Sequence, residues 1–214
     1  MEPTIRDATA ADAPFLAWVI QAAARSHVPV GVWDLALPGP DGPRLEYLAA
    51  LTVAEPVSFT HYDGFLVAEQ DGQPVAGLSA YDPATKTTDA FMMAINNALE
   101  ASGWSRVHRA LAIARMAPMG TCVPESLPGT WIIEWVAALP AARGRGIAGA
   151  LLQAILDRGR RAGYTKAQIS FLIGNDPAQA AYERAGFATI DEKRDADFEA
   201  AFRSAGIARM QREL

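Results

Sequence analysis

Hydrophobic and polar positions along the chain follow two different periods. Apolar runs and period-two alternation predict strands at 4–6, 65–69, 74–81, 131–138, 166–173, from Phe187, and at 207–212. Apolar residues three and four positions apart predict helices at 9–26, 44–51, 88–101, 105–115, 146–161, 176–185 and 195–204. This mixture of strands and helices predicts an α/β fold.

The strand at 131–138 carries a single acidic residue, Glu134. Strict alternation predicts one face with Trp131, Ile133, Trp135 and Ala137 and the other with Ile132, Glu134, Val136 and Ala138. An apolar setting between Ile132 and Val136 should raise the pKa of the Glu134 carboxyl group, which makes it a candidate general base.

A loop rich in glycine and arginine joins this strand to the next helix. Glycines allow the backbone to approach a bulky anion, and the first amides of a helix carry partial positive charge. We therefore expect a phosphate-bearing ligand here, bound mainly by the amides of Arg145, Gly146, Ile147, Ala148 and Gly149. The guanidinium groups of Arg143 and Arg145 either assist this binding or are solvated surface charges.

Two cofactor classes could use such a loop. Gly144, Gly146 and Gly149 spell G-x-G-x-x-G, the dinucleotide fingerprint of a nicotinamide-dependent oxidoreductase. Residues 139–143 separate the strand from the first glycine, and an apolar run occupies 169–173, where an acidic ribose ligand would be expected. Both departures disfavour the dinucleotide interpretation.

In another frame, residues 143–148 read R-x-x-G-x-A, which resembles the acyl-CoA pyrophosphate loop of the GNAT N-acetyltransferase superfamily. The segment NDPAQAAYERAGF at 175–187 is similar to a second signature of that family. The resemblance covers roughly 5–214, with a poorly matched middle. It implies one domain, 1–214, with the GNAT acyl-CoA N-acyltransferase fold, in which helices flank a mixed, splayed sheet.

The segment 82–129 departs most from the family pattern. Small acetyltransferases of this type pass almost directly from their third strand to their fourth, whereas here about 45 residues intervene. The two helices predicted at 88–101 and 105–115 therefore constitute an insertion between strands 3 and 4. It could form a wall of the acceptor site, contact another subunit or serve packing alone.

The resemblance implies acetyl-CoA as co-substrate and roles for particular residues. Glu134 would act as general base, unless it binds the acceptor's ammonium group or pairs with a nearby arginine. Tyr182 would protonate the leaving thiolate, unless it is an ordinary packed aromatic. Asn175 would hydrogen-bond the pantetheine or form an Asx turn. The Ala138 amide would polarise the thioester carbonyl. The implied cofactor-binding residues are Val136, Ala137, Ala138, Arg143, Gly144, Arg145, Gly146, Ile147, Ala148, Gly149, Asn175 and Tyr182.

Composition narrows the function further. The net charge of −5 argues against a nucleic-acid partner, and no apolar run approaches the roughly 18 residues that span a membrane. Cys122 is the single cysteine, and the polar N-terminus lacks a signal pattern, so we expect a cytoplasmic protein. Three scattered histidines show no metal-ligand spacing.

The sequence thus predicts an N-acetyltransferase for an amine of a small molecule or peptide. A non-catalytic acyl-CoA-binding sensor is the alternative. The sequence does not identify the acceptor, and a homodimer stays open.

Overall fold

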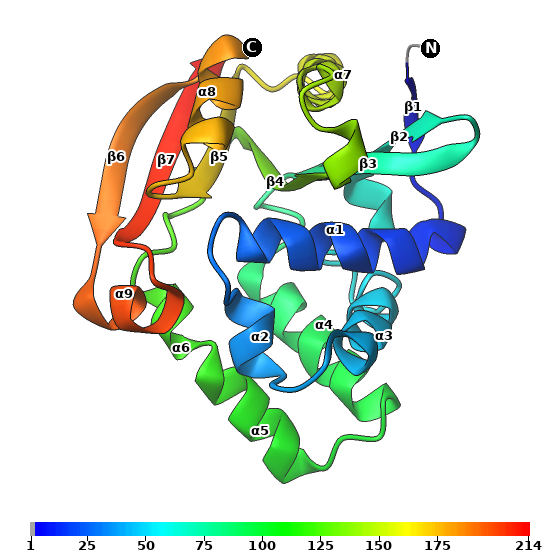
Figure 1. Ribbon diagram of the computed structural model, residues 1–214, viewed down its shortest axis with the longest axis vertical. Coiled ribbons are helices and arrows are strands. Elements are labelled where there is room, and N and C mark those ends of the chain that lie inside the picture. Colours follow the sequence, from blue (N-terminus) through cyan, green and yellow to red (C-terminus); the bar gives the residue numbers. More distant parts are fainter. Residues whose placement is uncertain (1–2) are drawn as a thin grey trace.

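A seven-stranded sheet with the order β1-β2-β3-β4-β5-β7-β6 forms the centre of the computed structural model (Figure 1). The structure describes residues 3–214, so the first two residues of the predicted domain lie outside it. The strands are β1 (Thr4–Asp7), β2 (Phe65–Gln70), β3 (Gln73–Tyr81), β4 (Thr130–Ala138), β5 (Lys166–Leu172), β6 (Ala188–Arg194) and β7 (Gly206–Glu213). Because β4 and β5 run parallel while β3 and β4 are antiparallel, the predicted mixed sheet is confirmed.

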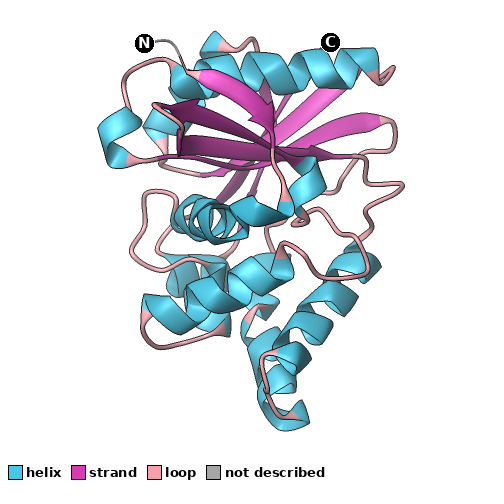
Figure 2. Ribbon diagram, turned by 90° about the vertical axis from the view of Figure 1, so that its right-hand side faces the viewer, coloured by secondary structure: helices cyan, strands magenta, loops and turns pink. Residues whose placement is uncertain are grey.

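Helices cover both faces of the sheet (Figure 2). In Figure 1, α7 and α8 lie on one face, and α1 and the group from α2 to α5 lie on the other. The helices are α1 (Ala13–Arg25), α2 (Val32–Ala36), α3 (Asp41–Leu51), α4 (Thr88–Ala101), α5 (Arg106–Arg115), α6 (Ala117–Gly120), α7 (Ile147–Arg161), α8 (Asp176–Arg184) and α9 (Ala196–Phe202). Short 3₁₀ turns occur at Ala10–Asp12, Tyr62–Gly64 and Pro140–Ala142.

The α1 helix lies directly against the sheet because glycine leaves room for it. A Cβ atom at Gly77 of β3 would lie 3.2 Å from Cγ2 of Val19. The helix buries Leu16, Ala17, Val19 and Ile20, whereas Phe15, Ala22 and Ala23, which helical spacing also assigns to the buried stripe, are only half-buried. The apolar face is therefore rotated toward Leu16 and Ile20.

The α7 helix packs on the opposite face, over β4. Its Gly159 lies so close to Trp131 that a Cβ atom there would lie 2.7 Å from Cδ1 of the indole. The indole N–H of Trp131 donates to the carbonyl oxygen of Ile155, at 3.1 Å. This contact fixes the axis of α7 relative to β4, and with it the position of the helix N-terminus.

The parallel strands β4 and β5 are paired for only part of their length. Their register runs from Thr130 opposite Lys166 to Ile133 opposite Ile169 and stops there. Beyond this point β4 continues to pair with β3, and β5 continues to pair with β7 as far as Leu172. The predicted splay is thus present, and the two strands turn unpaired edges toward each other from Glu134 onward.

A β-bulge interrupts β4 next to Glu134. Ser79 pairs with Glu134 and Gly77 pairs with Ala137, so two residues of β4, Trp135 and Val136, stand opposite one residue of β3. Trp135 has a φ of +54°. The strict alternation predicted for 131–138 is therefore wrong beyond Glu134: Val136 and Ala138 pack on the α7 face with Ile133, whereas Trp135 and Ala137 pack on the α1 face.

Helices α4, α5 and α6 occupy the segment between β3 and β4, where two helices are predicted. The bounds of α4 match the prediction, and Ser105 caps α5 by accepting from the amide of His108. The apolar stripe of α5 is not a buried face, because Val107 is 68% exposed and Leu111 is 45% exposed. Within residues 3–214, no helix is both long enough and apolar enough to cross a membrane.

Candidate active site

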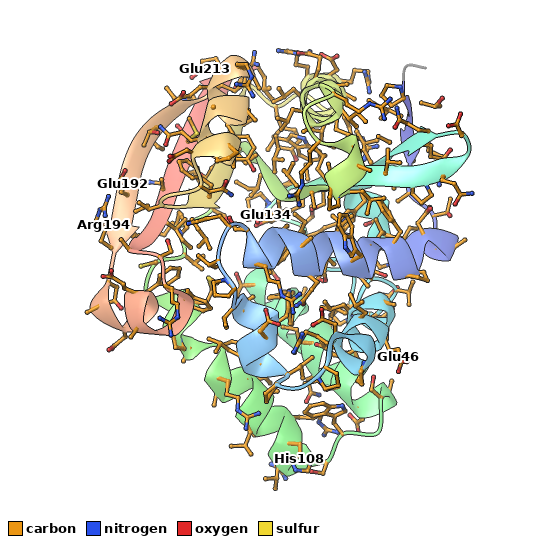
Figure 3. All side chains as sticks on the ribbon, in the orientation of Figure 1. Glu46, His108, Glu134, Glu192, Arg194 and Glu213 are labelled. Atoms are coloured by element: carbon orange, nitrogen blue, oxygen red, sulfur yellow. The ribbon has the colours of Figure 1, made fainter. Side chains whose placement is uncertain are left out.

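The Glu134 side chain lies at the point where the sheet opens. Glu134 is the first β4 residue beyond the last pairing with β5, and its side chain is on the α1 face, opposite Ile133. Figure 3 places it in the middle of the molecule, between the sheet and the α1 layer. Burial raises the pKa of the half-buried carboxyl group to about 7, as the sequence predicts. The group is therefore partly ionised at neutral pH.

Two buried phenols from different elements lie within electrostatic range of this carboxyl group. Burial raises the pKa of Tyr182 on α8 and of Tyr81 at the end of β3 above the ordinary range, and the charge of Glu134 raises both further. The Tyr182 ring lies edge-on to Phe171 and Phe187, with centroids 6.2 and 6.5 Å away. The structure thus brings the predicted pair, Glu134 and Tyr182, into one electrostatic neighbourhood.

Tyr81 is a site residue that the sequence interpretation missed. It pairs with Ile132 in the register, so its side chain is on the same face as Glu134 and diagonal to it. Its ring stacks on Phe59 at 5.0 Å, and its hydroxyl group lies 3.5 Å from that of Ser126 in the loop before β4. The alternation of β3 gives the face of Tyr81, but its position beside Glu134 depends on a β3–β4 register that pattern alone does not give.

The predicted anion loop ends in two left-handed glycines. Gly144 has a φ of +73° and Gly146 has a φ of +77°, and a Cβ atom at either position would meet nothing within 4 Å. Glycine is therefore required by the backbone conformation rather than by crowding. The amides of Ile147, Ala148 and Gly149 precede the first intrahelical hydrogen bond, from Ala150 N to Gly146 O. They form an electropositive, open helix N-terminus of the kind that binds phosphate.

The two arginines of the loop lie on its exposed side. Nε of Arg143 donates to the carbonyl oxygen of Ala138 at 3.2 Å, and Nη1 of Arg145 donates to Oε1 of Gln70 at 3.0 Å. These bonds fix the loop to the end of β4 and to the β2–β3 hairpin. Each guanidinium group retains further N–H donors, so either arginine can also contact an anion.

A groove of about 630 Å³ extends from this loop along the α1 layer. Pro140 and Arg143 line it on the loop side, and Trp18, His27 and Pro29 are among the residues that line it on the side of α1 and the following loop. The groove connects the anion loop to the segment 26–31, which separates α1 from α2.

Asn175 connects the two sides of the site. Its Oδ1 accepts from the amide of Ala178 at 3.2 Å and so caps α8, while its Nδ2 donates to Oγ of Ser26 at 2.6 Å. Asn175 is thus the N-cap of α8, and Asp176 is the first helical residue. The Asx-type capping geometry anticipated for Asn175 is present, and one Nδ2 hydrogen is left for a ligand.

Ala138, whose amide is expected to polarise the thioester, does not lie in the bulge. Ala138 lies in regular register with Ala76, whereas the irregularity is at Trp135 and Val136. A bulky aromatic residue with a positive φ cannot be recognised from hydrophobic pattern, because such residues rarely adopt this conformation. Any amide released from the β3–β4 ladder by the bulge therefore belongs to Trp135 or Val136.

Comparison with known proteins identifies what this arrangement resembles. The model of the acetyltransferase (GNAT) family matches residues 30–187, which is most of the chain. A search of curated proteins gives no matching relative.

Solved structures share the fold at low sequence identity. A crystal structure of an acetyltransferase has a TM-score of 0.69 at 19% identity, with 98% of each chain covered. An N-acetyltransferase from Staphylococcus aureus Mu50 has a TM-score of 0.62 at 20% identity, covering 98% of this chain and 100% of that one. The yncA protein from Salmonella typhimurium, in a structure with its cofactor acetyl-CoA, has a TM-score of 0.56 at 19% identity, covering 100% and 95%. The family match places the chain among acetyltransferases and not among nicotinamide-dependent oxidoreductases, the dinucleotide alternative.

Proposed function

Because the chain belongs to the acetyltransferase (GNAT) family, we propose that it transfers an acetyl group from acetyl-CoA to a primary amine by direct attack, without an acyl-enzyme. The observation that carries this proposal is Glu134. A carboxyl group with a pKa of about 7 stands where β4 and β5 separate, on the strand that leads into an open, anion-binding helix N-terminus. A base and a cofactor cleft are thus joined by one short segment of backbone.

The residues at the cleft suit acyl-CoA. The unpaired edges of β4 and β5 offer backbone donors and acceptors to the amides of a pantetheine chain, with Val136, Ala137 and Ala138 on one side and Asn175 on the other. The amides from Arg145 to Gly149 and the adjoining Gly144 then receive the pyrophosphate, with Arg143 beside them. The acyl group is left near Glu134.

Glu134 removes the proton that blocks attack. A free alkyl ammonium has a pKa near 10.4, whereas the Glu134 carboxylate has a pKa of about 7. Burial of the ammonium group lowers its own pKa, which narrows the remaining gap. Proton transfer to Glu134, directly or through water, then releases the neutral amine for attack on the thioester.

Tyr182 supplies the proton for the leaving thiolate. While Glu134 is charged, its field holds the pKa of the phenol high, so Tyr182 stays protonated. Once Glu134 has accepted the proton of the ammonium group, that field disappears and the phenol becomes a stronger acid. Base and acid are in this way coupled, and the phenol gains acidity at the stage when the thiolate leaves.

The bulge in β4 supports the developing negative charge. An amide of Trp135 or Val136 that does not pair with β3 can donate to the thioester carbonyl oxygen. One such donor contributes about 3 kcal/mol to transition-state stabilisation in well-studied enzymes.

Isothermal titration with acetyl-CoA, followed by a free-thiol release assay on a panel of amines, tests the proposal. Binding together with amine-dependent thiol release is expected. Binding without release by any amine would favour the acyl-CoA sensor, and failure to bind would remove the assignment of the anion loop.

A further inference from the structure

Helix α5 carries an apolar stripe that faces solvent. Residues three and four positions apart share one face of a helix, and on this face four apolar residues are exposed: Val107, Ala110, Leu111 and Ala114. The opposite face, which contains the buried Ala112, packs against α2 and α4. Figure 1 shows α5 at the edge of the helical layer that lies farthest from the sheet. No other segment of residues 3–214 covers the stripe.

Cations border the stripe on both sides. Helical spacing places Arg106 on one side and His108 and Arg115 on the other. Arg106 and Arg115 are exposed, and neither has a hydrogen bond or an ion pair with another residue of the described chain. Arg109 lies on the packed side instead, where it is 3.6 Å from a carboxylate oxygen of Glu100. No aspartate or glutamate occurs in 101–124, so this surface stays positive although the chain has a net charge of −5.

A groove of about 430 Å³ adjoins the stripe on the side of His108 and Arg115. Trp104 and Pro38 line it together with these two residues, so one wall comes from α5 and the other from the loop between α2 and α3. The Trp104 ring lies edge-on to His108, with centroids 6.2 Å apart. Such a groove can accept an apolar or aromatic side chain, and the guanidinium group of Arg115 can bind a carboxylate beside it.

We propose that the stripe and its flanking residues Arg106, His108 and Arg115, the basic α5 surface, bind an acidic amphipathic helix of a partner protein. The apolar face of that helix packs on Val107 and Leu111. Its carboxylates pair with Arg106 and Arg115, and one larger side chain enters the groove. The proposal does not depend on acetyl transfer, because none of these residues is assigned to acyl-CoA or to the acceptor.

Three other occupants fit the basic α5 surface less well. A second copy of this chain would place α5 against α5 in a two-fold contact and bring arginines together without an acid between them. A nucleic acid offers phosphates to the arginines but leaves Val107 and Leu111 without an apolar partner. An anionic membrane would repel the remainder of a chain with a net charge of −5, and the stripe lacks the large aromatic side chains of interfacial helices.

Fluorescence anisotropy of a labelled peptide, titrated with the full-length protein at about 50 mM salt, tests the proposal. The probe has about 18 residues, enough to form a helix, with leucine on one face and glutamate on both flanks. Leu111→Gln should weaken binding about five- to tenfold, because a 45% exposed leucine loses its apolar contact. Arg115→Gln should weaken it about two- to fivefold, as for an exposed ion pair, and should make binding less sensitive to salt.

Two matched control variants lie on other elements. Ile190→Gln on β6 changes a side chain that is 45% exposed, as Leu111 is, and Arg161→Gln removes an exposed arginine at the end of α7. Figure 1 shows both elements away from α5. Both variants should bind the peptide like the wild type. All four variants should keep the urea midpoint of the wild type, because substitutions at exposed positions change stability little. A peptide with lysine in place of glutamate should not bind.

Any of four results would overturn the proposal. No binding at about 1 mM protein would remove the docking surface. Equal losses in Leu111→Gln and Ile190→Gln would mean that the peptide binds elsewhere. Tighter binding of phosphatidylglycerol vesicles or of a single-stranded RNA, lost in Leu111→Gln, would assign the surface to a membrane or to a nucleic acid. A dimer in sedimentation that Leu111→Gln dissociates would assign it to a second copy of this chain.

Discussion

Replacing Glu134 by glutamine should stabilise the protein at alkaline pH while abolishing the base. Burial raises the pKa of this carboxyl group from 4.5 to about 7, so the native state binds the proton more tightly than the unfolded chain. The stability that this preference contributes is fully present below pH 4.5 and is lost as pH rises through 7. Because glutamine does not titrate, the Glu134→Gln variant should not lose this stability as pH rises.

The magnitude follows from the pKa difference of about 2.5. At 1.36 kcal/mol per pKa unit this corresponds to about 3 kcal/mol, and partial solvent access to the half-buried carboxyl group reduces it to about 2 kcal/mol. Urea unfolding of the wild type and of Glu134→Gln at pH 5 and pH 8 measures it. The stability advantage of the variant should grow by about 2 kcal/mol between the two values.

The ionisation of Glu134, which lowers the stability of the wild type as pH rises, should raise its activity. Wild-type kcat/KM for an amine should rise with pH through about 7 as Glu134 ionises, and Glu134→Gln should lose this limb. A stability difference that is the same at pH 5 and pH 8 would mean that the native carboxyl group titrates like a free glutamate. The reasoning that links burial to a neutral-pH base would then be refuted.

Three further outcomes are expected. Tyr182→Phe should retain acetyl-CoA affinity by isothermal titration and lose about 10² in turnover, and unchanged turnover would remove Tyr182 from the mechanism. Gly146→Ala should destabilise the protein by about 1 kcal/mol in urea unfolding, because Gly146 has a φ of +77°. Gly149→Ala should be neutral or stabilising, because Gly149 lies inside α7 with free space around it. Equal effects of the two substitutions would contradict the left-handed conformation of Gly146. Asn175→Ala should cost about 1–2 kcal/mol through the lost cap and the lost bond to Ser26, and Ser26→Ala should cost less, since the cap remains; the reverse order would contradict the capping geometry.

The parts of the site that follow from local physics could be read from the sequence. The glycine-rich loop before α7, the amphipathic helix α4 and the raised pKa of Glu134 depend on nearby residues and on burial that hydrophobic pattern reveals. The parts that depend on long-range pairing could not. The bulge at Trp135 depends on the β3–β4 register, and no propensity favours tryptophan with a positive φ.

Tertiary packing also overrode local signals elsewhere. Helix α2 forms in a stretch rich in proline and glycine, because Val32 and Trp33 become buried in the core on the α1 side. Conversely, Val107 and Leu111 have helical spacing but stay exposed, because spacing predicts the periodicity of a helix and not what packs against it.

The short pairing between β4 and β5 has a consequence for cooperativity. The sheet consists of two units: the first contains β1, β2, β3 and β4, and the second contains β5, β7 and β6. Four register pairs between β4 and β5 join the two units, and all other strand pairing lies within one unit. We expect amide hydrogen exchange to divide at this seam, with β5, β6 and β7 opening as one unit at lower free energy than global unfolding. A ligand that contacts the unpaired edges of both β4 and β5 would bind only the state in which the two units are paired. Amides of the two units should then exchange with the same free energy of opening.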